Sequence, residues 1–109
     1  MQIRKTYNEV NPELLYAEIR DFILKQGASL GENKLETFTL PDQSAAFVSR
    51  GTLTFKCKAD KECIRVHLVG SVRGETKLML DVDEELFSKE KLLALQSDLD
   101  FIFGSYEVK

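Results

Sequence analysis

The residues of this chain whose side chains could support chemistry are two cysteines, a single histidine and one run of acidic residues. Cys57 and Cys63 flank a polar turn, where a disulfide or a metal site could form. Alternation along the adjoining strands places Cys57 on the face of Phe55 and Cys63 on the face of Arg65, on opposite sides of a sheet. Only a bulge in the turn would bring the two thiols to one side. We therefore expect two separate thiols and no disulfide.

The other reactive residues fit no catalytic or metal-binding pattern. Two cysteines and one distant histidine fall short of the four ligands that structural zinc takes. No motif places a nucleophile beside His67, which is expected to be solvated on a polar strand face. The acidic residues at 81 and 83–85 lack the spacing of a calcium loop. The sequence predicts no metal, cofactor or catalytic residue and favours a protein that is not an enzyme, although a site assembled without local motifs stays open.

Composition and charge define the class of protein. Of the 109 residues, 43% are hydrophobic and 30% are charged, as in soluble globular proteins, and the length suits one domain spanning residues 1–109. A formal net charge of −3 gives no overall attraction to nucleic acid or to an anionic membrane. No apolar run reaches the roughly 18 residues of a membrane span, and the first residues lack the apolar core of a secretory signal. We expect a cytoplasmic location.

Hydrophobic periodicity predicts the elements that must position these residues. Apolar and polar residues alternate over 45–58, 63–72 and 77–82, which predicts three strands joined by polar turns. Weaker patterns predict strands at 2–9 and 35–40, the second following a loop at 28–34 and preceding a turn at 41–44.

Two amphipathic helices are predicted on either side of these strands. One begins at Asn11-Pro12 and ends at Gly27, and the other extends over about 88–103, capped by Ser88 and stopped by Gly104. The order predicts an α+β fold: an antiparallel meander sheet of about five strands, with an N-terminal and a C-terminal helix packed on one face. The pattern leaves open whether the first strand and the tail, 105–109, join the sheet.

The sheet face turned away from the helices is one candidate binding surface. It is predicted to be basic, and much of the acid lies on the helices. Such a face could bind an acidic partner or simply be solvated, and it lacks the stacking aromatics of an RNA-binding sheet, so nucleic acid is not expected. The candidate residues are Arg50, Lys56, Lys58, Arg65, His67 and Lys77.

The apolar interior is the other candidate. Small residues at 45, 49 and 51 on the long strand would leave room for a cavity between the sheet and the last helix, whereas an ordinary packed core is the alternative. The residues predicted to line the cavity are Phe38, Phe47, Phe55, Val66, Leu80, Leu99 and Phe103.

The first 22 residues resemble the start of helix-grip (START-like, polyketide-cyclase-like) domains. The resemblance rests on a strand, Ile3-Arg4-Lys5-Thr6, followed by Asn11-Pro12-Glu13-Leu14-Leu15-Tyr16 opening a helix. It implies a curved antiparallel sheet around a long C-terminal helix, with an apolar ligand cavity between them. This chain has room for fewer strands and a shorter last helix, and no functional residue is carried over.

These patterns predict a small non-enzymatic domain that binds a small apolar or amphipathic ligand between the sheet and the C-terminal helix. The alternative is a protein-interaction or assembly module, a homodimer that uses the basic outer face or an exposed edge strand. The ligand and the oligomeric state are not determined by the sequence.

Overall fold

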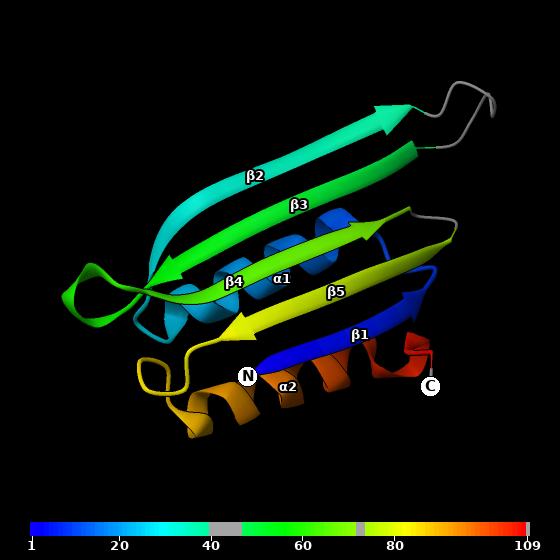
Figure 1. Cartoon of the computed structure of the whole chain (residues 1–109). Coiled ribbons are helices and arrows are strands. Elements are labelled where there is room, and N and C mark those ends of the chain that lie inside the picture. Colours follow the sequence, from blue (N-terminus) through cyan, green and yellow to red (C-terminus); the bar gives the residue numbers. More distant parts are fainter. Residues whose placement is uncertain (40–46, 72–73, 109) are drawn as a thin grey trace.

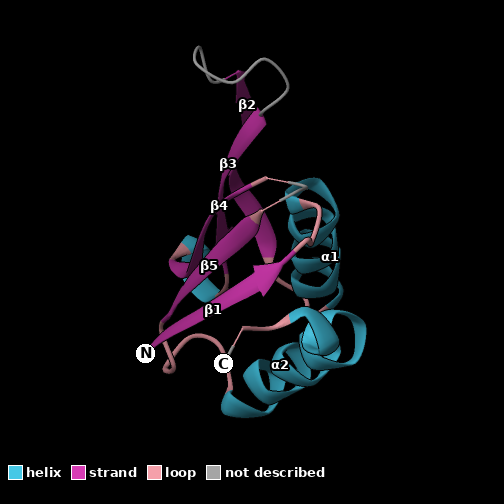
Figure 2. Cartoon of the chain, turned by 90° about the vertical axis from the view of Figure 1, so that its right-hand side faces the viewer, coloured by secondary structure: helices cyan, strands magenta, loops and turns pink. Residues whose placement is uncertain are grey.

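Five antiparallel strands form one sheet, and two helices lie on the same side of it (Figures 1 and 2). The computed structural model describes residues 1–39, 47–71 and 74–108. The strand order is β1-β5-β4-β3-β2, so that β2 to β5 form a meander and β1 lies beside β5. This arrangement confirms the predicted fold class. The elements are β1 (Gln2–Asn8), α1 (Pro12–Lys25), β2 (Ser29–Thr39), β3 (Phe47–Lys56), β4 (Glu62–Gly70), β5 (Glu75–Val82) and α2 (Lys89–Phe103).

Local capping residues define the helix ends, as predicted. Asn11 Oδ1 accepts a hydrogen bond from the backbone N–H of Glu13 at 2.9 Å, and Ser88 Oγ accepts one from Lys91 at 3.3 Å. Gly27 follows α1 with φ 96°, a left-handed conformation that suits glycine. Neither helix is long and apolar enough to span a bilayer, within the part of the chain that the structure describes.

The core fills the space between the sheet and the helix pair. Lys91 Nζ at the start of α2 donates to the carbonyl of Gln26 at the end of α1, at 2.8 Å, so the two helices pack antiparallel. Their apolar stripes and the inner face of the sheet form one cluster of buried residues. Its most deeply buried aliphatic members are Leu15, Ile19, Ile23, Leu53, Ile64, Val66, Leu68, Leu78, Leu80, Leu92, Leu95 and Leu99.

The second strand is longer than predicted. β2 begins at Ser29, within the segment expected to be a loop, and its register against β3 shifts between Leu30 and Asn33. The shift is a bulge, in which Gly31 lies against Thr54 without room for a side chain. The polar residues and the glycine that form this bulge are also typical of loops. For this reason the sequence predicts a loop where β2 begins. The predicted turn at 41–44 and the predicted strand start at 45 lie outside the described residues.

Cys57 and Cys63 form a disulfide, and the expectation of two separate thiols was wrong. Their Cα atoms are 5.8 Å apart, an ordinary distance for this bond. Lys56 pairs with Glu62, whereas the residue before Lys56 pairs with Ile64, so Cys63 is an extra, unpaired residue in β4. This bulge breaks the strict alternation and turns Cys63 toward Cys57.

The two ends of the chain meet at β1. The tail returns to this strand, where Glu107 forms an isolated antiparallel bridge with Tyr7 and the Val108 N–H donates to the carbonyl of Thr6 at 2.7 Å. Lys5 Nζ adds ion pairs to Glu107 at 3.1 Å and to Asp100 of α2 at 3.3 Å. Both the first strand and part of the tail therefore join the sheet.

Candidate functional site

The two edges of the sheet differ in how they are covered. The tail hydrogen-bonds to the outer side of β1, as described above. At the other edge, β2 pairs only with β3 among the described residues, and it is 11 residues long (Figure 1). The β2–β3 pair also extends beyond the helices (Figure 2). A long edge strand presents a row of backbone N–H and C=O groups to which another strand can bind.

Two charged side chains of opposite sign lie next to each other on the outer face of this edge. Lys34 lies opposite Thr52 and Glu36 lies opposite Arg50 in the register of β2 with β3. Lys34 Nζ is 3.2 Å from Glu36 Oε1, and the two side chains are 61% and 44% exposed. The regular part of the strand, from 33 to 39, thus carries a positive and a negative group that both reach solvent.

Helix α1 holds the same part of β2 from the inner face. Tyr16 is buried, and its hydroxyl donates a hydrogen bond to Asn33 Oδ1. The ring lies over Gly51, where an added Cβ would come within 2.8 Å of Tyr16 Cδ2 and 3.3 Å of Leu35 Cδ1. Burial raises the pKa of the Tyr16 hydroxyl, which stays protonated as a donor. Gly51 therefore allows α1 to reach across β3 and fix the edge strand.

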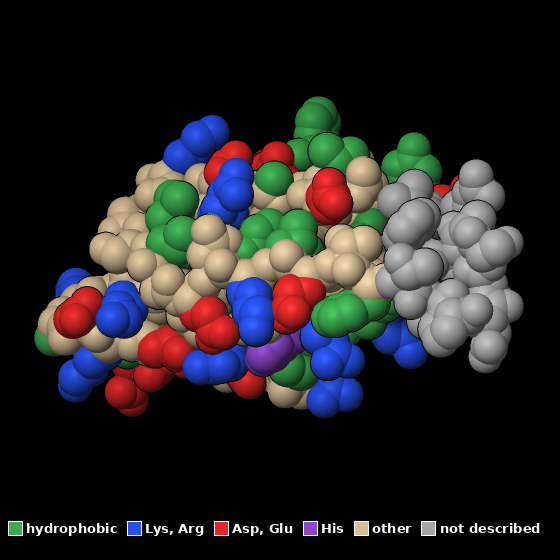
Figure 3. Space-filling view, turned by 90° about the horizontal axis from the view of Figure 1, so that it is seen from above, with side chains coloured by type: hydrophobic (Ala, Val, Ile, Leu, Met, Phe, Trp, Pro, Cys, Tyr) green, Lys and Arg blue, Asp and Glu red, His purple; other side chains and the backbone are tan. Residues whose placement is uncertain are grey.

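The predicted basic residues lie on or beside the outer face, but acidic residues share it. Arg65 pairs with Glu62 at 3.0 Å and Lys56 with Asp60 at 3.8 Å. Figure 3 shows Lys and Arg interspersed with Asp and Glu around the single histidine. The face is thus mixed in charge. Strand alternation places Arg50, Lys56, Arg65, His67 and Lys77 on it, and Lys58 begins the turn after β3.

The residues predicted to line a cavity are only partly brought together. Phe38 lies opposite Val48 on the outer face and is 47% exposed, and the Phe47 side chain lies outside the described residues. The other five pack in the continuous core between the sheet and the helices, where ligand binding stays a prediction. They are Phe55, Val66, Leu80, Leu99 and Phe103.

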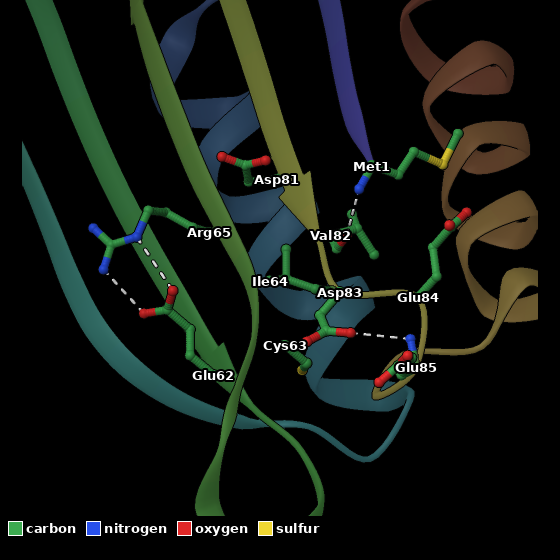
Figure 4. A pocket seen from close by; sticks show the side chains of 10 residues that line it. All are labelled: Met1, Glu62, Cys63, Ile64, Arg65, Asp81, Val82, Asp83, Glu84 and Glu85. Atoms are coloured by element: carbon green, nitrogen blue, oxygen red, sulfur yellow. Dashed lines mark hydrogen bonds and ion pairs between the residues drawn. The ribbon is translucent and has the colours of Figure 1, made fainter.

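An open depression of about 710 Å³ lies where β4 and β5 meet the chain leaving β5 (Figure 4). The Met1 ammonium donates to the carbonyl of Val82 at 2.8 Å, and Asp83 accepts from the Glu85 N–H at 3.0 Å. Local groups thus satisfy much of its polar lining. No cluster of three or more His, Cys, Asp or Glu among the described residues could hold a metal ion. The depression is lined by Met1, Glu62, Cys63, Ile64, Arg65, Asp81, Val82, Asp83, Glu84 and Glu85.

Sequence reasoning missed the residues of the β2 edge. Lys34 lies in the segment predicted to be a loop, and Glu36 lies in a strand predicted to belong to the meander, whose position at an edge depends on where the first strand pairs. The signal for this strand was weak, because its apolar residues Leu35 and Phe38 are three positions apart and lie on opposite faces, and the bulge before them obscured where the strand starts.

Comparisons with known proteins gave no match to a family model, to a curated protein or to a solved structure. The resemblance to helix-grip domains therefore rests on the residues quoted for it above.

Proposed function

We propose that this protein is an interaction module that binds a polypeptide strand at the free edge of β2. The observation that carries the proposal is the contrast between the edges: the tail hydrogen-bonds to β1, whereas β2 has no second strand among the described residues. In strand addition, backbone hydrogen bonds supply affinity and alternate side chains supply selectivity. This role needs no catalytic residue.

The edge is ordered before a partner arrives, which lowers the entropy lost on binding. Seven consecutive residues, 33 to 39, keep regular register with β3, and Tyr16 fixes Asn33 from below. Lys34 and Glu36 protect the edge against indiscriminate pairing, because a strand that places a like charge opposite either one is disfavoured. The bulge at 31–32 limits pairing to the part of the strand that follows it.

Two neighbouring proline variants test this edge. Adjacent N–H groups of a strand point to opposite sides, so one of Glu36→Pro and Thr37→Pro removes a backbone hydrogen bond to β3, and the other removes an outward N–H. Each variant also loses one side-chain contact, the ion pair of Glu36 with Lys34 or the hydrogen bond of Thr37 with Ser49. The variant whose melting temperature stays closer to that of the wild type identifies the outward position and serves as the edge variant.

The binding probe is a set of extended nine-residue peptides selected from a random library on the wild-type protein. We expect the selected peptides to slow amide hydrogen exchange over 33–37 in the wild type and to lose binding to the edge variant. Peptides that bind both proteins equally, or that protect β1 instead, would overturn the proposal. Peptides that protect only the inner core would support the ligand-binding prediction.

A further inference from the structure

We infer that the strand bound at this edge is the β2 of a second copy of the chain, paired antiparallel about Leu35. This inference rests on the proposed function and identifies the strand that the β2 edge binds. A two-fold axis normal to the sheet makes two antiparallel edge strands continuous and keeps the helices of both copies on one face. With the axis at Leu35, each Lys34 lies opposite Glu36 of the second copy, and two opposite-charge pairs form.

The charge pattern distinguishes this register from its neighbours. An axis at Lys34 would place Lys34 opposite Lys34, and an axis at Glu36 would place Glu36 opposite Glu36, both with like charges directly paired. At Leu35, each Glu36 lies between Arg50 of its own chain and Lys34 of the second copy. Alternating charge thus continues across the junction. An axis at Asn33 would bring the bulge at 31–32 into the paired segment.

The inner face is compatible with the same register. Leu35 is half-buried and packs against the core of its own chain, and in the pair it lies opposite Leu35 of the second copy. Asn33 then lies opposite Thr37, a polar pair. The contact between the two Leu35 side chains excludes water from the centre of the junction, which charged side chains alone would not do.

The helices do not obstruct the pairing. Helix α1 packs chiefly over β3 and β4, with a smaller contact on β2. Strands are about 4.8 Å apart, so β3 lies about 7 Å from the axis and the two α1 helices stay at least about 14 Å apart, more than the roughly 10–12 Å diameter of a helix.

The pairing also has a natural limit at two copies. Once the β2 edges have paired, the outer strands of the joined sheet are the two β1 strands. The tail of each copy already occupies Thr6 and Tyr7 of its β1. A closed dimer is therefore expected, and not an open-ended stack.

Charge-reversal variants test both the partner and the register. Lys34→Glu and Glu36→Lys each turn two attractive pairs into two repulsive ones, and we expect the dimer dissociation constant from sedimentation equilibrium to rise on the order of tenfold or more. An equimolar mixture of the two variants restores complementarity, and so does the double variant K34E/E36K. Native mass spectrometry with one variant isotopically labelled should show heterodimers in the mixture. Charge reversal at Lys77, on the outer face away from the edge, is the matched control.

Each outcome separates this inference from the proposed function. Restoration in the mixture and in the double variant supports the register. A wild-type protein that stays at 12.4 kDa at its highest soluble concentration overturns the second-copy inference, while peptide binding lost in the proline edge variant still supports strand addition. A dimer that is indifferent to Lys34 and Glu36 but weakened at Lys77 overturns the inference in favour of the outer face. If the edge variant keeps both peptide binding and dimerisation, the proposed function and the second-copy inference are both overturned.

Discussion

Tyr7 is a fully buried residue whose hydroxyl has no hydrogen-bond partner among the described residues. Its ring packs edge-on against Phe103, with centroids 6.0 Å apart, and burial raises the pKa of the hydroxyl. A buried unpaired polar group costs about 1–3 kcal/mol. Tyr7→Phe keeps the ring contact and should raise the free energy of unfolding in urea by about 1 kcal/mol, at the low end of that range.

Tyr16→Phe is the matched control for this prediction. It removes a hydroxyl that is paired, with Asn33, and should lower the free energy of unfolding by about 0.5–1.5 kcal/mol. A Tyr7→Phe variant less stable than the wild type would mean that the Tyr7 hydroxyl does have a partner.

Glu18 makes the helix pair sensitive to pH. The neighbouring Asp98 carboxyl group of α2, together with burial, raises the pKa of Glu18, while Lys25 opposes and Asp21 adds to the shift. The folded state therefore binds this proton more tightly than the unfolded chain does. The resulting stability is fully present below the unfolded-state pKa and is lost as the pH rises through the folded-state pKa.

Glu18→Gln should therefore be more stable than the wild type at neutral pH, by less than about 1 kcal/mol for a solvent-accessible pair. The difference should shrink as the pH falls toward the ordinary pKa of a glutamate. Urea unfolding at several pH values measures it, with Glu84→Gln, an exposed carboxylate outside the helices, as the control. Equal stability of Glu18→Gln and wild type at every pH would show that the two carboxyl groups do not interact.

At the scale of elements, local signals were sufficient for the helices but not for the edges of the strands. Asn11, Gly27 and Ser88 act on backbone groups within a few residues, so their roles could be predicted. The bulges at 31–32 and at Cys63 depend on pairing between strands, which no local pattern reports. The position of β2 at an edge depends on β1 pairing with β5, a contact between distant parts of the sequence. The sequence therefore predicted an exposed edge strand only as one alternative interface, and it could not predict that β2 would form it.

The disulfide should stabilise the β3–β4 hairpin by restricting the unfolded chain. Cys57 and Cys63 are six positions apart, and the loop-entropy relation gives about 2 kcal/mol for so short a loop. Reduction should lower the free energy of unfolding by about this amount, measured in urea with and without a phosphine reductant. The double variant Cys57→Ala/Cys63→Ala should not respond to the reductant. A wild-type protein with the same stability in both conditions would contradict the prediction.

The disulfide also bears on the expected cytoplasmic location. Cytosolic thiols are normally kept reduced, so a cytoplasmic protein would carry Cys57 and Cys63 as thiols and form the bond only on oxidation. Rapid alkylation in intact cells followed by mass spectrometry distinguishes the two states. Full alkylation of both cysteines indicates a reducing compartment, and protection of both indicates an oxidising one.

At the scale of the whole molecule, one apolar cluster connects the sheet with both helices. The cluster includes residues from β1 and β3 to β5 and from both helices, so no helix can detach without exposing the inner face of the sheet. The molecule measures 46 × 27 × 20 Å, and its long dimension reflects the strand pair that extends beyond the helices (Figure 2). Loss of one buried side chain from α2 should therefore weaken the whole fold and not the helix alone.

Leu99 tests this coupling, because it is fully buried on α2. Leu99→Ala should lower the free energy of unfolding by about 2–5 kcal/mol, as core truncations do. Far-ultraviolet circular dichroism reports the sheet and helices, and tyrosine fluorescence reports the core, since the chain has no tryptophan. The two transitions should coincide in the variant as in the wild type.

Leu93→Ala is the control on the same helix, because Leu93 is 52% exposed, and its effect should stay within about 0.5 kcal/mol. A loss below about 1 kcal/mol for Leu99→Ala would mean that α2 does not seal the sheet. Separate transitions for the two probes would mean that α2 unfolds on its own, leaving β1 without the Lys5–Asp100 ion pair. The β1 edge would then lose part of its cover, and the contrast between the two edges on which the proposed dimer depends would be reduced.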